Sequence, residues 1–132
     1  MKKLAILAFA ALAACTANEG VDADADDESK LAAQLKDYRA SGPAVSCVPL
    51  RDLRSNRSAG EGAIVFEGTG GRLWVNRPPA GCPDMRFGRS LQIRTTGSQL
   101  CRGDIAVVFD PVSGMEFGGC GLGDFEPYRR DR

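Results

Sequence analysis

The sequence contains no histidine among its 132 residues. This absence removes the side chain that most often serves as a general base or metal ligand, and with it the serine and cysteine triads of the usual form. Lysine is also scarce, since every basic residue after Lys36 is an arginine. Guanidinium groups are suited to anion recognition, but a biased nucleotide composition, which the many alanines and glycines also indicate, explains the arginines more simply. The composition therefore argues against a hydrolase.

The longest uncharged apolar run lies at the N-terminus, where it covers residues 4–12 after two lysines. It is too short for a stable transmembrane helix, which needs about 20 residues. Small residues follow it, as a signal-peptide cleavage site requires, and the motif Leu12-Ala13-Ala14-Cys15 resembles the lipobox of bacterial lipoproteins. The resemblance implies that residues 1–14 are a signal peptide and that Cys15 carries a lipid anchor. An ordinary secretory signal with an incidental cysteine, or a buried helix, is the alternative.

Thr16 follows the cysteine at the position where, by resemblance to enteric sorting rules, an aspartate would retain the protein at the inner membrane. We therefore expect a cell-envelope location at the outer membrane, with the chain facing the periplasm and held to the membrane by its lipid anchor. Nucleic acid is not an expected partner in this compartment.

Charge divides the rest of the chain into two unlike parts. Six acidic residues and no basic residue fall between positions 16 and 28, whereas residues 44–132 hold twelve arginines and ten carboxylates. An acidic, alanine-rich stretch buries too little apolar surface to offset the entropy of ordering it. We therefore expect residues 15–28 to form a flexible acidic tether. The 118 residues after the signal peptide suffice for one domain with a single core.

Residues 29–42 are expected to contain a short amphipathic helix. The aspartates just before this segment can cap it, and Leu31, Leu35 and Tyr38 recur at helical spacing to form one apolar stripe. A Ser-Gly-Pro sequence then ends the helix. Because so short a helix is marginal alone, its stripe is predicted to pack against the domain or a partner.

Four cysteines remain after Cys15, and an even number in a small exported domain indicates a disulfide framework. The sequence allows three connectivities. We favour the nested pairing, Cys47 with Cys120 and Cys82 with Cys101, because it joins the first and last strands of the domain. A zinc site is disfavoured, since such sites use closely spaced cysteine pairs and no two of these are closer than 19 positions. We expect no metal and no cofactor.

Residues 44–130 consist of short β-type runs separated by glycine, proline, asparagine and serine, which predicts a mainly β, antiparallel domain. The expected strands are residues 45–50, 62–67, 72–76, 90–95, 104–109, 115–119 and 124–128. Turn residues at 68–71 and 110–114 predict two hairpins. Strands this short bury a common face only in a small barrel-like form or a sandwich, and we favour the barrel-like form.

No set of side chains stands out as catalytic. Asp104 with Asp110, and Asp124 with Glu126, are spaced so that each pair could share a strand face, but a solvated surface is the simpler interpretation. The glycines between positions 114 and 123 lack the lysine of a phosphate-binding loop and indicate bulges and tight corners instead.

Arg51, Arg54 and Arg57 could form a basic rim for an anionic partner. Asp52 and the other polar residues around them favour a solvated loop.

Four segments together resemble small proteobacterial lipoproteins of unknown function: RLWVNR at 72–77, GCP at 81–83, RTTGSQLCRGDI at 94–105 and CGLGDF at 120–125. The resemblance implies an exported four-cysteine domain and no particular activity. The function we expect is that of a non-enzymatic, membrane-anchored envelope protein that binds another protein or a cell-wall component. The alternative is an inhibitor of a cell-wall hydrolase, resembling the small β-barrel lipoproteins that block lysozymes, with residues 78–88 as the inserting loop. A carboxylate enzyme is the least favoured hypothesis.

Overall fold

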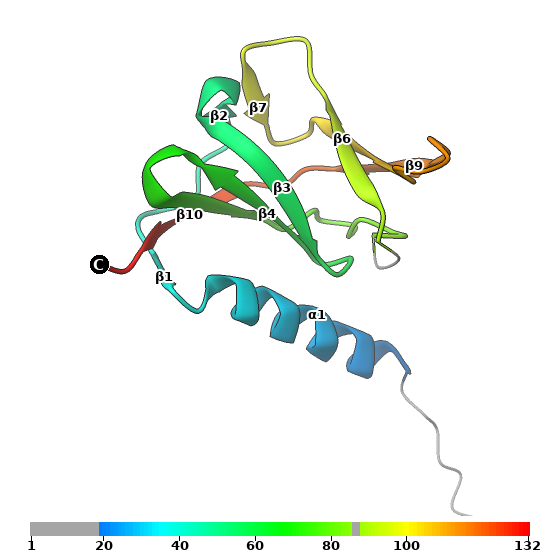
Figure 1. The fold of residues 1–132 in the computed structure, drawn as a ribbon, viewed down its shortest axis with the longest axis horizontal. Helices are drawn as coiled ribbons and strands as arrows, with labels where there is room; N and C mark the ends of the chain where they lie inside the picture. Colours follow the sequence, from blue (N-terminus) through cyan, green and yellow to red (C-terminus); the bar gives the residue numbers. More distant parts are fainter. Residues whose placement is uncertain (1–18, 86–87) are drawn as a thin grey trace, which may run out of the picture.

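The computed structural model describes residues 19–85 and 88–132, with side chains from Asp24 onward. In this part of the chain one helix, α1 (Glu19–Leu35), precedes ten short strands, and every ladder between them is antiparallel (Figure 1). The predicted mainly β class with one N-terminal helix is therefore confirmed. The predicted signal peptide and Cys15 lie outside the described residues.

The strands and the two 3₁₀ turns between them follow in chain order: β1 (Tyr38–Ala40), β2 (Cys47–Pro49), η1 (Leu50–Asp52), β3 (Leu53–Ala59), β4 (Ala63–Gly68), η2 (Thr69–Gly71), β5 (Arg72–Asn76), β6 (Ser90–Arg94), β7 (Gln99–Cys101), β8 (Ile105–Phe109), β9 (Glu116–Gly121) and β10 (Phe125–Arg130).

Three separate sheets make up the β domain. The largest has five strands in the order β1-β10-β5-β4-β3, a second has the order β6-β8-β9, and β2 pairs with β7. Within the described residues these sheets surround a shared core but do not join into one closed ring. The favoured barrel-like form is therefore not a continuous barrel. The segment between β5 and β6 contains Pro78, Pro79 and Pro83. Proline cannot donate the backbone hydrogen bonds that would join the five-stranded sheet to the three-stranded sheet.

One hydrophobic cluster fills the space between the sheets. We call it the bridged core because it includes both cysteines of the Cys82–Cys120 disulfide. The five-stranded sheet contributes Phe66, Trp74 and Phe125, and the rings of Phe66 and Phe125 lie 5.7 Å apart. The other buried members are Val48, Ile64, Cys82, Met85, Leu91, Leu100, Ala106, Val108, Cys120 and Leu122.

The disulfides connect Cys47 with Cys101 and Cys82 with Cys120, so the nested pairing predicted from the sequence is wrong. Cys47 and Cys101 are direct cross-strand partners on β2 and β7, with Cα atoms 4.0 Å apart. Cys82, in the loop after β5, reaches Cys120 on β9 inside the bridged core. Strand register brings the first cysteine of the domain beside the third, and the predicted framework of two disulfides is otherwise confirmed.

The opposite face of the five-stranded sheet packs against α1, and we call this second cluster the helix core. Its buried members are Leu31, Ala59, Ala63, Val65, Leu73 and Val75. Leu35, Tyr38 and Tyr128 pack at its edge. The predicted apolar stripe therefore does face the domain, although Tyr38 reaches the cluster from β1 rather than from the helix.

The helix boundaries predicted from the sequence are wrong at both ends. Helix α1 begins at Glu19, within the stretch 15–28 that was expected to be a flexible tether, and it ends at Leu35 rather than continuing to residue 42. Acidic side chains in the first turns of a helix are favoured by the helix dipole. The helix is also fixed to the domain, because Asp27 is 7% exposed and its carboxylate accepts the Glu61 backbone N–H at 3.0 Å.

Six of the expected strands lie within two residues of an observed strand at each end, and the segment 72–76 coincides with β5. Both predicted hairpins are confirmed, since β4 pairs with β5 and β8 pairs with β9. The sequence did not predict β1, β3 or β7. Strand β3 carries mostly polar side chains and forms an edge of the five-stranded sheet, where only one side of the strand needs a partner.

Two disulfides indicate an oxidising, extracytoplasmic compartment. Among the described residues, no helix is long and apolar enough to cross a bilayer.

Candidate anion-binding site

The first carboxylate pair considered from the sequence does not form, because Asp104 and Asp110 flank opposite ends of β8. Asp104 accepts the Cys101 backbone N–H at 2.8 Å. Asp110 accepts the N–H groups of Val112 and Ser113 at 2.7 and 3.0 Å. These backbone hydrogen bonds, from Ser113 and then Val112, hold the pKa of the Asp110 carboxyl below its usual value. Each aspartate shapes a turn.

The second pair is divided between two arginines. Asp124 lies 3.3 Å from a guanidinium nitrogen of Arg102, and Glu126 lies 3.6 Å from one of Arg77. All four side chains are at least 40% exposed, so these are solvated surface ion pairs, as the simpler interpretation predicted. No three of the described acidic or cysteine side chains are grouped as metal ligands.

The glycine cluster near the C-terminus forms tight backbone contacts. A Cβ at Gly123 would lie 2.5 Å from the Arg77 carbonyl oxygen. The fully buried Asn76 side chain accepts the Gly123 N–H and donates to its carbonyl. Gly118 has a φ of +103°, beside a bulge in the β8–β9 ladder. These glycines bend the backbone, in agreement with the interpretation made from the sequence.

The basic cluster around Arg54 is not the predicted loop, because Arg54 and Arg57 lie on β3 and Arg51 lies in η1. Arg57 forms an ion pair with Glu67 at 2.7 Å on the neighbouring strand. The β3–β4 ladder gives this polar segment its hydrogen-bond partners. The three arginines therefore lie along the edge of the sheet, where Glu67 offsets the charge of Arg57.

The loop considered as an inhibitory segment lies against the domain in its described part. Cys82 and Met85 are buried in the bridged core. The Cys82 N–H donates to the Glu61 carbonyl at 2.7 Å, and the Asp84 N–H donates to the Glu61 carboxylate at 3.0 Å. The disulfide from Cys82 thus fixes the loop, and the described residues of the loop do not project as a free finger.

A different set of basic side chains comes together at one end of the five-stranded sheet. Arg39 on β1 is the cross-strand partner of Arg129 on β10, and Arg129 is in turn the partner of Arg72 on β5. Directly paired residues point to the same face of a sheet, so the three guanidinium groups share one face. Neighbouring strands lie about 4.8 Å apart, which gives this arginine row a length of about 10 Å.

The arginine row is poorly neutralised. Like charges placed directly opposite each other in a ladder are destabilising, and within the described chain the only ion pair of the row joins Arg39 to Asp131 at 3.3 Å. The Arg39 side chain is still 74% exposed. Arg130 points to the other face, where it donates to the Tyr38 hydroxyl at 2.9 Å, a contact that raises the pKa of Arg130. A row in which only Arg39 has an ion-pair partner among the described residues is suited to an anion.

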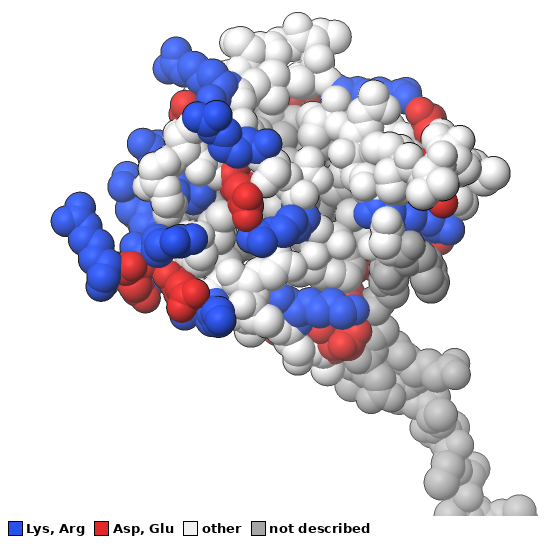
Figure 2. Space-filling view, viewed as in Figure 1, with Lys and Arg blue, Asp and Glu red and all other residues white. Residues whose placement is uncertain are grey.

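Shallow hollows lie around the arginine row. One of about 560 Å³ is lined by Arg39, Arg129, the C-terminal residues that follow and the two glycines of η2. Another, of about 190 Å³, lies between Arg72 and Arg129 beside Trp74 and Pro127. Figure 2 shows basic side chains gathered at the end of the molecule where the C-terminus lies in Figure 1, with a few acidic side chains among them. An extended anionic group can therefore reach several guanidinium groups together.

No family model, curated protein or solved structure matches this chain. The arginine row is therefore interpreted from its own geometry. Sequence reasoning missed it because its three members are more than 30 residues apart and only strand register brings them together. The sequence did contain one indication of this site, because basic residues occur near both ends of the domain, at Arg39 and at Arg129.

Proposed function

We propose that this chain is a non-enzymatic, lipid-anchored protein of the cell envelope whose domain binds an anionic partner through the arginine row. The observation that supports the binding role is the register of Arg39, Arg129 and Arg72. Three aligned guanidinium groups cost stability in the free protein, and an anion that bridges them removes this cost. Guanidinium groups bind carboxylates and phosphates through paired N–H donors.

The ligand is expected to carry two or more negative groups about 5 Å apart, to match the strand spacing. A partner with a single charge would contact only part of the row. Anionic cell-wall polymers and acidic segments of envelope proteins have this character. The lipid anchor at Cys15 would hold the domain at the membrane, where such partners are concentrated.

Binding of defined polyanions tests the role of the row. Poly-glutamate and polyphosphate serve as the carboxylate and phosphate probes, and affinity is measured by fluorescence anisotropy at two salt concentrations. We expect Arg72→Gln with Arg129→Gln to weaken binding at least tenfold and to reduce its salt dependence.

A matched control removes the same charge from another surface. Arg94 and Arg102 form ion pairs with Glu116 and Asp124 and lie outside the arginine row. Arg94→Gln with Arg102→Gln should therefore change the affinity less than twofold. Equal losses in the two double variants would mean that only the overall charge matters, and the proposed site would be abandoned.

The anchor has its own test, which does not depend on the ligand. Mass spectrometry of protein recovered from membranes should show a mature chain that begins with an acylated Cys15. Cys15→Ser should move the protein from the membrane fraction to the soluble fraction. An intact N-terminal methionine on the native protein would contradict the proposal.

A further inference from the structure

The turn between β8 and β9 presents two apolar side chains to solvent. Val112 is 96% exposed and Met115 is 59% exposed. The turn is held by its own hydrogen bonds: Asp110 accepts the N–H groups of Val112 and Ser113, and the Gly114 N–H donates to the Asp110 carbonyl at 2.8 Å. The backbone therefore holds Val112 and Met115 at an outward-facing tip, which we call the apolar tip.

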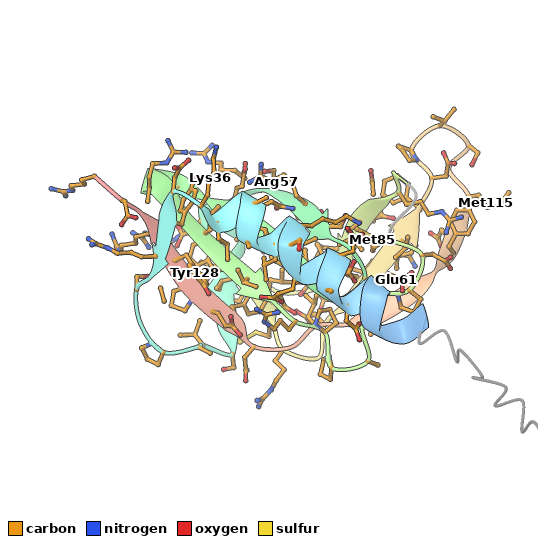
Figure 3. All side chains as sticks on the ribbon, turned by 90° about the horizontal axis from the view of Figure 1, so that it is seen from below. Lys36, Arg57, Glu61, Met85, Met115 and Tyr128 are labelled. Atoms are coloured by element: carbon orange, nitrogen blue, oxygen red, sulfur yellow. A yellow bond between two sulfur atoms is a disulfide. The ribbon has the colours of Figure 1, made fainter. Side chains whose placement is uncertain are left out.

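The apolar tip and the arginine row lie at opposite ends of the molecule. In Figures 1 and 3, which share their horizontal axis, the β8–β9 turn and the start of α1 lie toward the same end. Met115 is labelled at this end in Figure 3, whereas Tyr128, which precedes Arg129, lies toward the other end. The C-terminus is also at the far end in Figure 1. The start of the helix and the apolar tip thus lie toward the same end of the molecule, although they are separated from each other across that end in both views.

The position of Cys15 in the chain limits how far this end can lie from a membrane. Only four residue steps separate Cys15 from Glu19, the first residue of α1, and a chain spans at most about 3.5 Å per residue. The start of α1 therefore lies within about 14 Å of the acylated residue. Leu31 is buried in the helix core, and Asp27 is hydrogen-bonded to the β3–β4 turn. The orientation of the domain is therefore fixed relative to the helix.

We propose that the apolar tip contacts the lipid bilayer to which Cys15 is anchored, so that the arginine row faces away from the membrane. This inference rests on the proposed lipid anchor. Apolar side chains gain free energy when they leave water for the interface, and the anchor keeps the tip near that interface. The acidic side chains of Asp24, Asp26 and Glu28 on α1 disfavour a pose in which the helix lies flat on anionic headgroups.

Depth-dependent quenching of tryptophan tests this orientation in the full acylated protein. The protein is reconstituted into phosphatidylcholine vesicles whose acyl chains are brominated near the headgroup. The native Trp74 is 6% exposed in the bridged core and supplies a constant background. The probe variant is Val112→Trp, and the matched control is Arg132→Trp at the far end of the molecule. Both positions are exposed, so circular dichroism should match that of the native protein.

We expect the quenching of the added tryptophan to be at least threefold greater in Val112→Trp than in Arg132→Trp. Equal quenching of the two would mean that the domain lies flat, and no quenching of Val112→Trp would mean that the tip does not reach lipid. Either result overturns the inference while leaving the anchor intact, because acylation of Cys15 is measured separately by mass spectrometry in the same samples. Absence of acylation would instead contradict the proposed function.

Discussion

The two faces of the five-stranded sheet are stabilised in different ways. The bridged core lies between the three sheets and contains the Cys82–Cys120 disulfide. Beside it, the Cys47–Cys101 disulfide joins β2 to β7. The helix core on the opposite face contains no cysteine and is closed by one helix that contributes one fully buried leucine. Covalent links therefore hold the face made of short, separate sheets. Side-chain packing and noncovalent polar contacts, such as the hydrogen bond from the Glu61 N–H to Asp27, hold the face covered by α1. The two faces should respond to different perturbations.

The largest expected effect is on the bridged core. Cys82→Ala with Cys120→Ala opens a link between residues 38 positions apart, and the loop-entropy estimate gives a loss of about 4 kcal/mol in the free energy of unfolding. Chemical denaturation followed by circular dichroism measures this loss. A loss below about 1 kcal/mol would show that packing, rather than the bond, holds this face.

The stability of the helix core should depend on the side chain of Leu31, which is 2% exposed. Leu31→Ala leaves a cavity between α1 and the sheet and should cost about 3 kcal/mol. Ala32→Ser, one residue away on the exposed side of the helix, should change stability by less than about 0.5 kcal/mol. If the loss from Leu31→Ala depended on whether the disulfides were reduced, the two faces would not be independent.

The contact between α1 and the β3–β4 turn gives an intermediate effect. Asp27→Ala removes the acceptor of the Glu61 N–H and should cost about 1 to 2 kcal/mol. Hydrogen exchange of the Glu61 amide should accelerate with it. Asp27→Asn keeps an acceptor oxygen at the same place and should retain most of the protection of that amide. Unchanged exchange in Asp27→Ala would show that the helix core holds α1 without this hydrogen bond.

Removing one charge from the arginine row should stabilise the free protein. Arg129→Gln relieves repulsion from both cross-strand partners and should raise the free energy of unfolding by about 0.5 kcal/mol at low salt. The gain should shrink as added salt screens these exposed charges. A loss of stability in this variant would mean that the side chain is held by packing instead.

The smallest effect concerns the turn that forms the apolar tip and is confined to acid. The pKa of Asp110 is lower in the folded protein than in the unfolded chain, because the folded turn donates two backbone hydrogen bonds to the carboxylate. Its stabilising contribution is therefore complete above the unfolded pKa of about 3.9 and is lost as the pH falls through the folded value. An NMR titration of the Asp110 carboxyl should give a midpoint below that of an aspartate in a model peptide.

Sequence patterns predicted the elements that depend on local alternation. Strand β5 was located because Leu73 and Val75 share one face, while Trp74 lies between two polar residues on the other, after a glycine-rich turn. Strand β3 was missed because its partner, not its own composition, makes it a strand. The start of α1 was missed because a run of acidic residues favours disorder in isolation, whereas packing of Leu31 and burial of Asp27 favour a helix.

Long-range register could not be read from the sequence. All three disulfide pairings satisfied the spacing of the cysteines, and only the alignment of β2 with β7 selects Cys47–Cys101. The arginine row depends on register in the same way, since it requires β1 and β5 to lie on either side of β10. The proposed site was therefore hidden until the strands were paired, although each of its arginines was visible.

The crossed order of the two disulfides has a consequence for proteolysis. Any single cut between residues 47 and 120 falls inside at least one of the two covalent loops, so the fragments stay attached to each other. This interval contains nine arginines, and all of them except Arg77, which precedes a proline, are potential cleavage sites for a trypsin-like protease. A nicked molecule would run as two pieces only on a reducing gel, and both halves of the domain would stay joined to each other under non-reducing conditions.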